Sequence, residues 1–157
     1  MKKLLVLDSH DYNNNVPVFE KNAVRAIIIK NGLFAMQLGN SGEHKIPGGT
    51  VEEGESFEQA LLREIREETG LSVKPDSITE LGEIEEIRRD RFLGSRKYIC
   101  HSFYYRCEVW EEVLETDMTM QETNLGYHLE WASIRQIISA NFRLLKETWE
   151  MRDTLFF

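Results

Sequence analysis

Apolar and polar positions along the chain form short runs that are typical of β-strands. The run 23–30 is rich in β-branched residues, and Asn31-Gly32 behind it is a strong hairpin signal. Longer β-compatible runs come later in the chain, and polar segments separate them. The pattern predicts strands over residues 23–30, 33–38, 78–89, 97–110 and 128–132.

The middle of the chain changes to a pattern that is rich in helix formers. Ser56 and Gln59 form a capping box at its start, in which each side chain accepts a hydrogen bond from a backbone N–H of the other residue. Gly70 supplies a C-terminal stop. We therefore expect a helix over residues 57–69.

A second capping box, Ser133 with Gln136, opens an apolar-periodic stretch, and helical spacing continues from 142 to 152. The chain thus runs from strands to a helix, then to more strands and a closing helical region. This order predicts an α/β or α+β fold with a mixed sheet between helices.

The composition is that of one ordinary globular domain. The chain has 157 residues, of which 41% are apolar and 29% are charged. A chain of this length can fold without a disulfide or a second lobe, so we treat residues 1–157 as a single domain. Cys100 and Cys107 lie seven residues apart on one predicted strand, so they point to opposite faces and cannot pair with each other.

The net charge narrows the range of partners. Lys plus Arg number 19 against 27 for Asp plus Glu, which gives a formal charge of −8. This balance argues against a nonspecific grip on long nucleic acid, which needs many contacts between cations and phosphates. The early apolar run Leu4–Leu7 is too short for a membrane span or a signal peptide, so we expect a cytoplasmic protein without a membrane partner.

Three carboxylates share one face of the helix predicted over 57–69. At about 100° per residue, Glu67 lies at about −60° and Glu68 at about +40° from Glu64. Phe57 and Leu61 fall in the same sector, at about +20° and +60°, so the acidic face points toward the protein. Carboxylates crowded there lose hydration and repel one another, and raised pKa values or a bound cation offset these costs.

Oxygen ligands without nearby histidine are typical of hard cations, which indicates Mg²⁺, or Mn²⁺ as a substitute, and not zinc. The Gly48-Gly49 turn just before the helix can bring a backbone carbonyl to the same ion. Arg63 lies four residues before Glu67 and can orient it by a charge-assisted pair. From these residues alone, a solvated glutamate-rich surface helix remains the alternative.

A fixed spacing then runs from Gly49 to Leu71. Five residues separate Gly49 from Glu55, seven more follow, and the sequence Arg63-Glu64-Ile65-Arg66-Glu67-Glu68-Thr69-Gly70-Leu71 closes the motif. With every fixed position filled over 23 contiguous residues, the segment resembles the signature of the Nudix hydrolases. The resemblance implies an αβα sandwich around a mixed sheet. It also implies metal-dependent hydrolysis of a pyrophosphate bond in a nucleotide, a nucleotide-sugar or an ADP-ribose-like substrate.

Carried over to this chain, the resemblance assigns roles to particular residues. The implied metal ligands, for Mg²⁺ or Mn²⁺, are the Gly49 carbonyl, Glu64, Glu67 and Glu68. The implied catalytic group is Glu64, Glu67 and Arg63, and Glu55 is implied to brace the loop.

The general base differs between proteins of this type, and some take it from a later loop. Here Glu122 and Glu130 are alternatives to the helix carboxylates. The sequence leaves this choice open.

Cations for a substrate phosphate come from two places. Residues 88–97 hold five cations against Asp90 alone, a net of +4 that makes Arg88 and Arg89 candidate substrate-binding residues. The alternative for this segment is solubilising charge at a hairpin tip. Arg25 lies in an otherwise apolar strand, where a buried guanidinium needs an anion, either a substrate phosphate or a helix glutamate.

The segment 149–157 is apolar for a terminus. We expect it to dock on the body of the domain, or on a second copy of the chain in a homodimer.

The leading hypothesis from the sequence is divalent-metal-dependent hydrolysis of a small nucleotide derivative. Its rival is a non-catalytic module of the same fold that binds or senses a nucleotide without turnover. The filled signature argues against the rival, because a sensor has no use for a costly carboxylate cluster.

Overall fold

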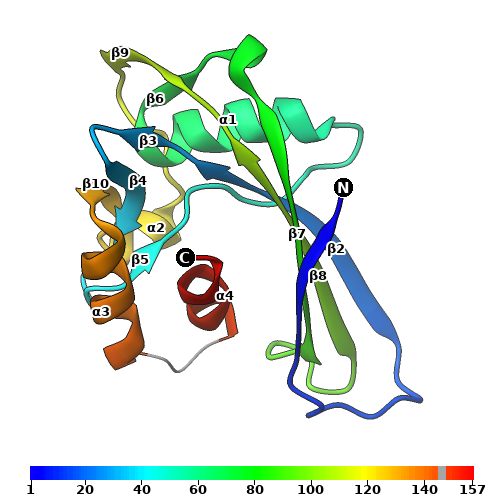
Figure 1. Cartoon of the computed structure of the whole chain (residues 1–157). Helices are drawn as coiled ribbons and strands as arrows, with labels where there is room; N and C mark the ends of the chain where they lie inside the picture. Colours follow the sequence, from blue (N-terminus) through cyan, green and yellow to red (C-terminus); the bar gives the residue numbers. More distant parts are fainter. Residues whose placement is uncertain (145–147) are drawn as a thin grey trace.

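The computed structural model describes residues 1–144 and 148–157, without the side chains of 148–151, and combines strands with helices (Figure 1). The strands are β1 (Lys3–Asp8), β2 (Val18–Ile27), β3 (Ile29–Lys30), β4 (Leu33–Leu38), β5 (His44–Lys45), β6 (Leu71–Val73), β7 (Thr79–Arg89), β8 (Lys97–Arg106), β9 (Val109–Val113) and β10 (His128–Ala132). The helices are α1 (Phe57–Thr69), α2 (Met120–Asn124), α3 (Ile134–Leu144) and α4 (Thr148–Phe156), with a short 3₁₀ helix at Pro75–Ser77.

One four-stranded sheet has the strand order β1-β7-β8-β2. β7 and β8 are antiparallel, whereas β1 runs parallel to β7 and β2 runs parallel to β8. A second sheet has the order β10-β4-β3 with β5 on β4, and all its described pairs are antiparallel. The predicted mixed sheet is therefore confirmed, beside a second sheet that the sequence did not separate from it.

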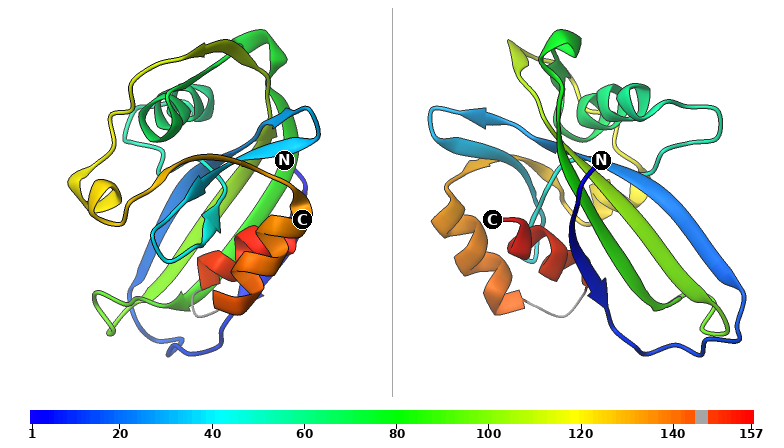
Figure 2. Two further views of the ribbon diagram at one scale, coloured as in Figure 1. Left: turned by 90° about the vertical axis from the view of Figure 1, so that its left-hand side faces the viewer. Right: turned by 45° about the vertical axis from the view of Figure 1, so that its right-hand side comes forward.

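The β1-β7-β8-β2 sheet lies between two apolar cores. Successive residues of a strand point to opposite faces, and Tyr104 and Tyr105 on β8 enter different cores. Tyr105 packs with Leu61 and Ile65 of α1, and Tyr104 packs with Ile137 of α3. Figure 2 shows α3 and α4 side by side and well apart from α1. Helices thus cover both faces of the sheet, as the predicted sandwich requires.

Local signals set the ends of the helices as predicted. Ser56 and Gln59 form the capping box of α1, and Gly70 ends the helix in the left-handed conformation. Ser133 and Gln136 exchange hydrogen bonds of 2.9 and 3.3 Å at the start of α3. These caps depend on neighbouring residues only, which is why the sequence reveals them.

Two predicted strands are wrong in extent. The run 23–30 is divided, because β2 pairs with β8 as far as Ile27 whereas β3 pairs with β4 in the other sheet. The run 97–110 is also divided, since β8 ends at Arg106 and β9 pairs with β6. Cys107 therefore lies beyond the strand that holds Cys100. Both cysteines are buried and free.

The C-terminal helices are tied to the chain just before the glycine turn. The Asn141 side chain on α3 accepts a hydrogen bond from His44 N at 2.7 Å and donates one to His44 O at 2.8 Å. Asp153 on α4 accepts a hydrogen bond from Ile46 N at 3.0 Å. The end of the chain thus supports β5 and the residues after it.

The apolar tail docks on the body of the domain. The rings of Phe156 and Tyr104 stack at 4.4 Å between centroids, and Phe157 meets Phe34 edge-on at 4.9 Å. For Phe156 and Phe157, this outcome confirms the first of the two expectations for segment 149–157. Residues 145–147, inside the predicted helical stretch 142–152, lie outside the described residues.

No helix in the described part of the chain is long and apolar enough to cross a bilayer.

Candidate active site

The segment before α1 runs along β2 and brings its glycines to the helix. Backbone hydrogen bonds of 2.9 to 3.0 Å join Ala26 N to Pro47 O, Val24 N to Gly49 O and Val51 N to Asn22 O. Residues 47–51 are therefore held as rigidly as a strand, directly before the loop that leads into α1.

Gly48 and Gly49 meet two close approaches that a side chain would block. Gly48 has φ +129°, and a Cβ there would lie 2.1 Å from the Val24 carbonyl oxygen. A Cβ on Gly49 would lie 2.3 Å from the carboxylate of Glu64. Only glycine tolerates the conformation and contact at position 48, whereas a side chain at position 49 would displace the Glu64 carboxylate. The Gly49 carbonyl accepts one hydrogen bond from Val24 N and retains a second lone pair for another ligand.

The acidic face of α1 points into the protein, as the helical wheel predicts. The side chains of Glu64, Glu67 and Glu68 are 14%, 36% and 3% exposed, so the solvated-face alternative is wrong for this helix. Glu68 accepts a 2.6 Å hydrogen bond from Gly48 N and lies 3.1 Å from Lys45 Nζ. The glycine turn and the helix are thus joined through one buried carboxylate.

Arg63 connects the loop to two of the carboxylates. Its Nε and Nη2 donate to the two oxygens of Glu55 at 2.8 and 2.9 Å, and Nη2 also donates to Thr50 O at 3.0 Å. Its Nη1 lies 3.0 Å from Glu64 and 3.1 Å from Glu67. Bidentate pairing holds Glu55 in its charged form and its pKa below the ordinary value.

Burial and mutual repulsion disfavour the charged forms of the α1 carboxylates, and a bound cation would offset this cost. Burial, followed by repulsion from Glu68, raises the pKa of Glu64. Burial also raises the pKa of Glu68, although Lys45 and Gly48 N–H oppose the shift. With the Gly49 carbonyl, these residues offer oxygen ligands, and the described lining of their cavity holds no histidine or cysteine. This donor set fits a hard divalent cation such as Mg²⁺ or Mn²⁺.

The carboxylates line one end of a cleft made of two adjoining cavities. The proximal cavity, of about 490 Å³, contains the glycine turn, Arg63, Glu64, Glu67 and Glu68. The distal cavity, of about 440 Å³, reaches Glu86, Arg88, Tyr98 and Arg152. The two cavities share six lining residues, Lys21, Arg25, Lys45, Thr119, Gln121 and Glu122. Cations therefore lie between the acidic end and the distal end of the cleft.

The predicted substrate-binding arginines occupy different places. Arg25 is buried in the shared part of the cleft, where its Nη1 donates to Gly48 O. Arg88 lies in the distal cavity, its guanidinium 3.9 Å from the ring centroid of Tyr98 and its Nε 2.7 Å from Glu86. Arg89 lines a separate cavity of about 370 Å³, beside Asp11 and Asp90. The structure thus brings Arg25 and Arg88 into the cleft and leaves Arg89 outside it.

The two alternative general bases, Glu122 and Glu130, lie in different places. Glu122, on α2, lines both cavities. Burial opposes its charge, but hydrogen bonds from the Thr119 hydroxyl and backbone N–H outweigh it and lower the pKa of Glu122. Glu130 faces Met36 across the β10-β4 pair and lies outside the lining of both cavities. Only Glu122 of the two is placed to meet a substrate.

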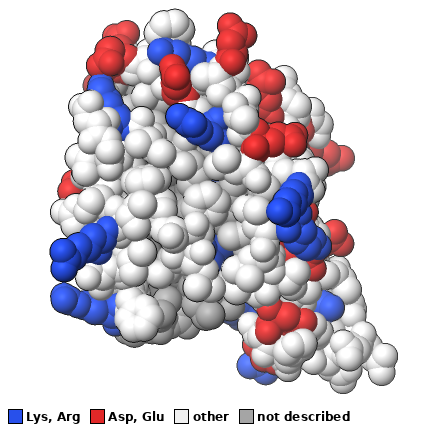
Figure 3. All heavy atoms as spheres, viewed as in Figure 1, with Lys and Arg blue, Asp and Glu red and all other residues white. Residues whose placement is uncertain are grey.

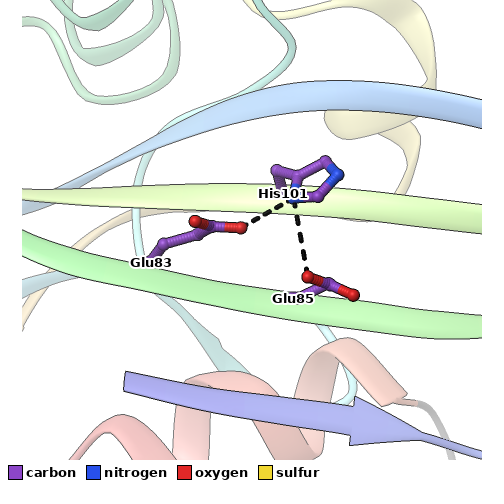
Figure 4. A group of neighbouring side chains, drawn as sticks. All are labelled: Glu83, Glu85 and His101. Carbon is purple, nitrogen blue, oxygen red and sulfur yellow. Dashed lines mark hydrogen bonds and ion pairs between the residues drawn. The ribbon is translucent and has the colours of Figure 1, made fainter. Parts of the chain in front are cut away.

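A second acidic group lies on the face of the β1-β7-β8-β2 sheet opposite to the distal cavity. Glu83 and Glu85 on β7 and His101 on β8 place one possible ligand atom each within 4.8 Å of one another (Figure 4). His101 Nδ1 lies 2.6 Å from Glu83 and Nε2 lies 3.0 Å from Glu20, while Lys3 contacts Glu85. Lys3 and His101 already pair with these carboxylates, so the group is an ion-pair network apart from the cleft.

We expect His101→Gln to lower the melting temperature more at about pH 6 than at about pH 8.5. Burial disfavours the imidazolium, but the hydrogen bonds with Glu83 and Glu20 outweigh it and raise the pKa of His101. A raised histidine pKa gives stability that is full below about pH 6.5 and is lost as pH rises through the folded-state value. Thermal scans of both proteins across this range test it, and an equal difference at both pH values would contradict it.

Acidic side chains gather on the surface where α1 and the loop before it lie (Figure 3). Exposed members of this group include Glu52, Glu53 and Glu58. Their negative field favours a cation at the nearby carboxylates and opposes a polyanion there without one.

Sequence reasoning missed three cations of the cleft: Lys21, Lys45 and Arg152. Lys21 and Arg25 lie four residues apart on one strand, so period-2 alternation could have placed both on one face. Lys45 lies just before the glycine turn in the sequence, and this position could have predicted a place beside the turn in the cleft. No local signal marks Arg152, which reaches the cleft only through the packing of α4.

Comparisons with known proteins agree with this geometry. A family model described as NUDIX domain matches residues 20–155. Nucleoside triphosphatase NudI of Escherichia coli is 40% identical over 63 residues, which are 40% of this chain and 45% of that protein. The match therefore spans less than half the length of this curated relative.

Solved structures show the same fold. A NUDIX hydrolase from Nitrosomonas europaea superposes with a TM-score of 0.58 at 21% identity, over 86% of this chain and 88% of that one. A structure named UDP-X diphosphatase gives a TM-score of 0.53 at 26% identity, over 75% of this chain and 53% of that one.

Proposed function

Because the chain belongs to the NUDIX domain family, we propose that it is a pyrophosphohydrolase that cleaves a small nucleoside diphosphate derivative with the help of a divalent metal. The observation that carries the proposal is the inward-facing set Glu64, Glu67 and Glu68 beside the Gly49 carbonyl, at one end of a cleft whose next residues are cations. Carboxylates in such a place are costly to the fold without a cation.

In this proposal, Glu64, Glu67, Glu68 and the Gly49 carbonyl hold Mg²⁺ or Mn²⁺. A divalent ion held there would supply positive charge against the diphosphate and lower the pKa of a water molecule nearby. Arg63 keeps Glu64 and Glu67 in place and ties them through Glu55 to the loop. The chain's own contribution is a preorganised oxygen cage that needs little rearrangement when the substrate arrives.

Proton transfer falls to a carboxylate that solvent can reach. Glu67 is the most exposed of the three at 36%, and Arg63 fixes one of its oxygens at 3.1 Å. This placement suits a base that takes a proton from water. Glu122, across the cleft, is the alternative, and Glu122→Gln beside Glu67→Gln separates the two by their pH–rate profiles.

The cations of the cleft suit the rest of the substrate. Lys45 pairs with Glu68, one of the proposed metal ligands, and Arg25 lines the same cavity. Tyr98, with Arg88 stacked on its ring, offers an aromatic surface in the distal cavity. A substrate with its phosphate groups near the α1 carboxylates and its nucleobase near Tyr98 would occupy both ends of the cleft.

We expect hydrolysis to require an added divalent ion and to disappear in excess chelator. The assay screens nucleoside triphosphates, nucleoside diphosphate sugars and ADP-ribose with Mg²⁺ or Mn²⁺ and measures released phosphate, pyrophosphate or nucleoside monophosphate. Full activity in excess chelator would refute metal dependence. Nucleotide binding without turnover under every condition would favour the sensing module instead.

A further inference from the structure

Three cations of the cleft differ from the others in the groups that they contact. Elsewhere in the cleft, Lys45 pairs with Glu68 and Arg88 pairs with Glu86, at 3.1 and 2.7 Å. Lys21 and Arg25 on β2 have no carboxylate of the described residues within ion-pair distance, whereas Arg152 on α4 has Asp153 and Glu86, and all three cations line the distal cavity. This difference between neighbouring cations needs an explanation.

Arg152 is almost completely enclosed, with 3% of its surface exposed. Its Nε donates to Asp153 at 2.7 Å, and its Nη1 lies 3.9 Å from Glu86. Its Nη2 is buried without a hydrogen-bond partner. A buried guanidinium nitrogen that bonds nothing costs free energy, and the residue that carries it lines a cavity large enough for a ligand.

Lys21 and Arg25, the two cations on β2, also have incomplete sets of partners. Arg25 donates through Nη1 to Gly48 O, while its Nε is buried and has no partner. Lys21 Nζ lies 3.1 Å from the Thr50 hydroxyl, and no carboxylate of the described residues lies within ion-pair distance of it. Burial, with the nearby charges of Arg25 and Arg152, lowers the pKa of Lys21. The fold therefore holds three cations close together in one cavity.

Charges of one sign inside one cavity repel each other and lose hydration, and a bound anion relieves both costs. The distal cavity also contains Glu86 and Glu122, but Arg88 and Arg152 share Glu86, and Glu122 accepts hydrogen bonds from Thr119. The carboxylates of α1 line the proximal cavity together with Lys21 and Arg25, and of the three cations only Arg152 is confined to the distal cavity. The lining of the distal cavity holds five Lys and Arg residues against two carboxylates, so an anion from outside the chain suits its charge.

We propose that Lys21, Arg25 and Arg152 form an anion subsite that takes a phosphate group of the substrate beyond the diphosphate held at the α1 carboxylates. The inference rests on the proposed function and narrows its substrate class. A substrate that fills both places carries at least three phosphoryl groups, as a nucleoside triphosphate does. A nucleoside diphosphate sugar would leave the subsite empty.

The test combines Lys21→Gln and Arg152→Gln with Lys30→Gln as the matched control. Lys30 pairs with the exposed Glu111 on the surface and loses the same charge outside the cleft. Binding of inorganic tripolyphosphate to metal-free protein is measured by calorimetry. We expect both cleft variants to bind at least about tenfold more weakly and the control to bind as the unmodified chain does.

Thermal scans distinguish a ligand site from a structural role. Removing Lys21 relieves repulsion in the empty cavity, so Lys21→Gln should melt at the same temperature or higher while it binds tripolyphosphate more weakly. Arg152→Gln removes a partner of the buried Asp153 and should melt lower. If Arg152→Gln does not fold, Lys21→Gln decides the matter alone, and unchanged tripolyphosphate binding in it would overturn the subsite.

Kinetics separate this inference from the proposed function. In Lys21→Gln, KM for a nucleoside triphosphate should rise at least about tenfold, while KM for a nucleoside diphosphate sugar should stay within about twofold. An equal rise for both substrates would overturn the subsite and leave the hydrolase intact. Tripolyphosphate binding that depends on Lys21, with no hydrolysis of any substrate, would support the subsite and refute the hydrolase.

Discussion

Glu64→Gln is expected to reduce hydrolysis by at least about a hundredfold and to raise the melting temperature of the metal-free protein. The amide keeps the shape of the side chain but removes a charge that the proposed metal site needs. Burial and the charge of Glu68 raise the pKa of Glu64, so its ionised form destabilises the fold at neutral pH. Removing that charge relieves the cost, which makes the inactive variant the more stable one.

The control for this prediction is Glu58→Gln on the same helix. Glu58 is exposed in the first turn of α1, where a carboxylate interacts favourably with the helix dipole. The control should keep full activity and melt slightly lower, with the opposite sign of stability change. A Glu64→Gln protein that loses stability would show that Arg63 already compensates the Glu64 charge. Retained activity would remove Glu64 from the metal site.

Arg63→Gln is expected to lose both activity and stability. The guanidinium pairs with Glu55, Glu64 and Glu67 and also bonds Thr50 O, so its removal leaves three carboxylates without their common cation. Charged hydrogen bonds of this kind contribute about 1.5 to 3 kcal/mol each, reduced here by partial exposure. We expect a loss of about 2 kcal/mol, which lowers the melting temperature by roughly 4–8 °C in a chain of this size.

Arg63→Lys separates charge from geometry. Lysine restores one cation but cannot pair with both oxygens of Glu55, so it should recover part of the stability and little of the activity. Arg135→Gln, on the exposed face of α3, is the matched control and should change neither property. Calorimetry with steady-state assays of all three proteins measures both effects. Full activity in Arg63→Gln would show that the helix carboxylates need no support from the loop.

The parts of the fold that the sequence predicts are those that depend on near neighbours. The capping boxes at Ser56 and Ser133 and the acidic face of α1 follow from spacings of three or four residues. The divided strand around Ile27 does not, because the alternation continues while the hydrogen-bonding partner changes from β8 to β4. Periodicity shows that residues are extended but not which strand they pair with.

Some residues of the candidate site can likewise be predicted from the sequence, and others cannot. The carboxylates, the glycine turn and Arg63 lie within one contiguous segment, so spacing alone assembles them. Arg152 comes from a helix whose docking depends on Asp153 and on aromatic packing against β8. A contact between residues so distant in sequence follows from the three-dimensional packing and leaves no local pattern.

The hydrogen bond between Asp153 and Ile46 joins parts of the cleft that are synthesised at different times. The two residues are 107 positions apart, so Ile46 and the glycine turn leave the ribosome well before the helix that supports them. At bacterial or eukaryotic elongation speeds, this interval is roughly 5 to 20 s. Through that time the motif segment exists without α4, and the wall that carries Arg152 is missing. A nascent chain therefore holds every carboxylate of the cleft before it can close the distal end around a ligand.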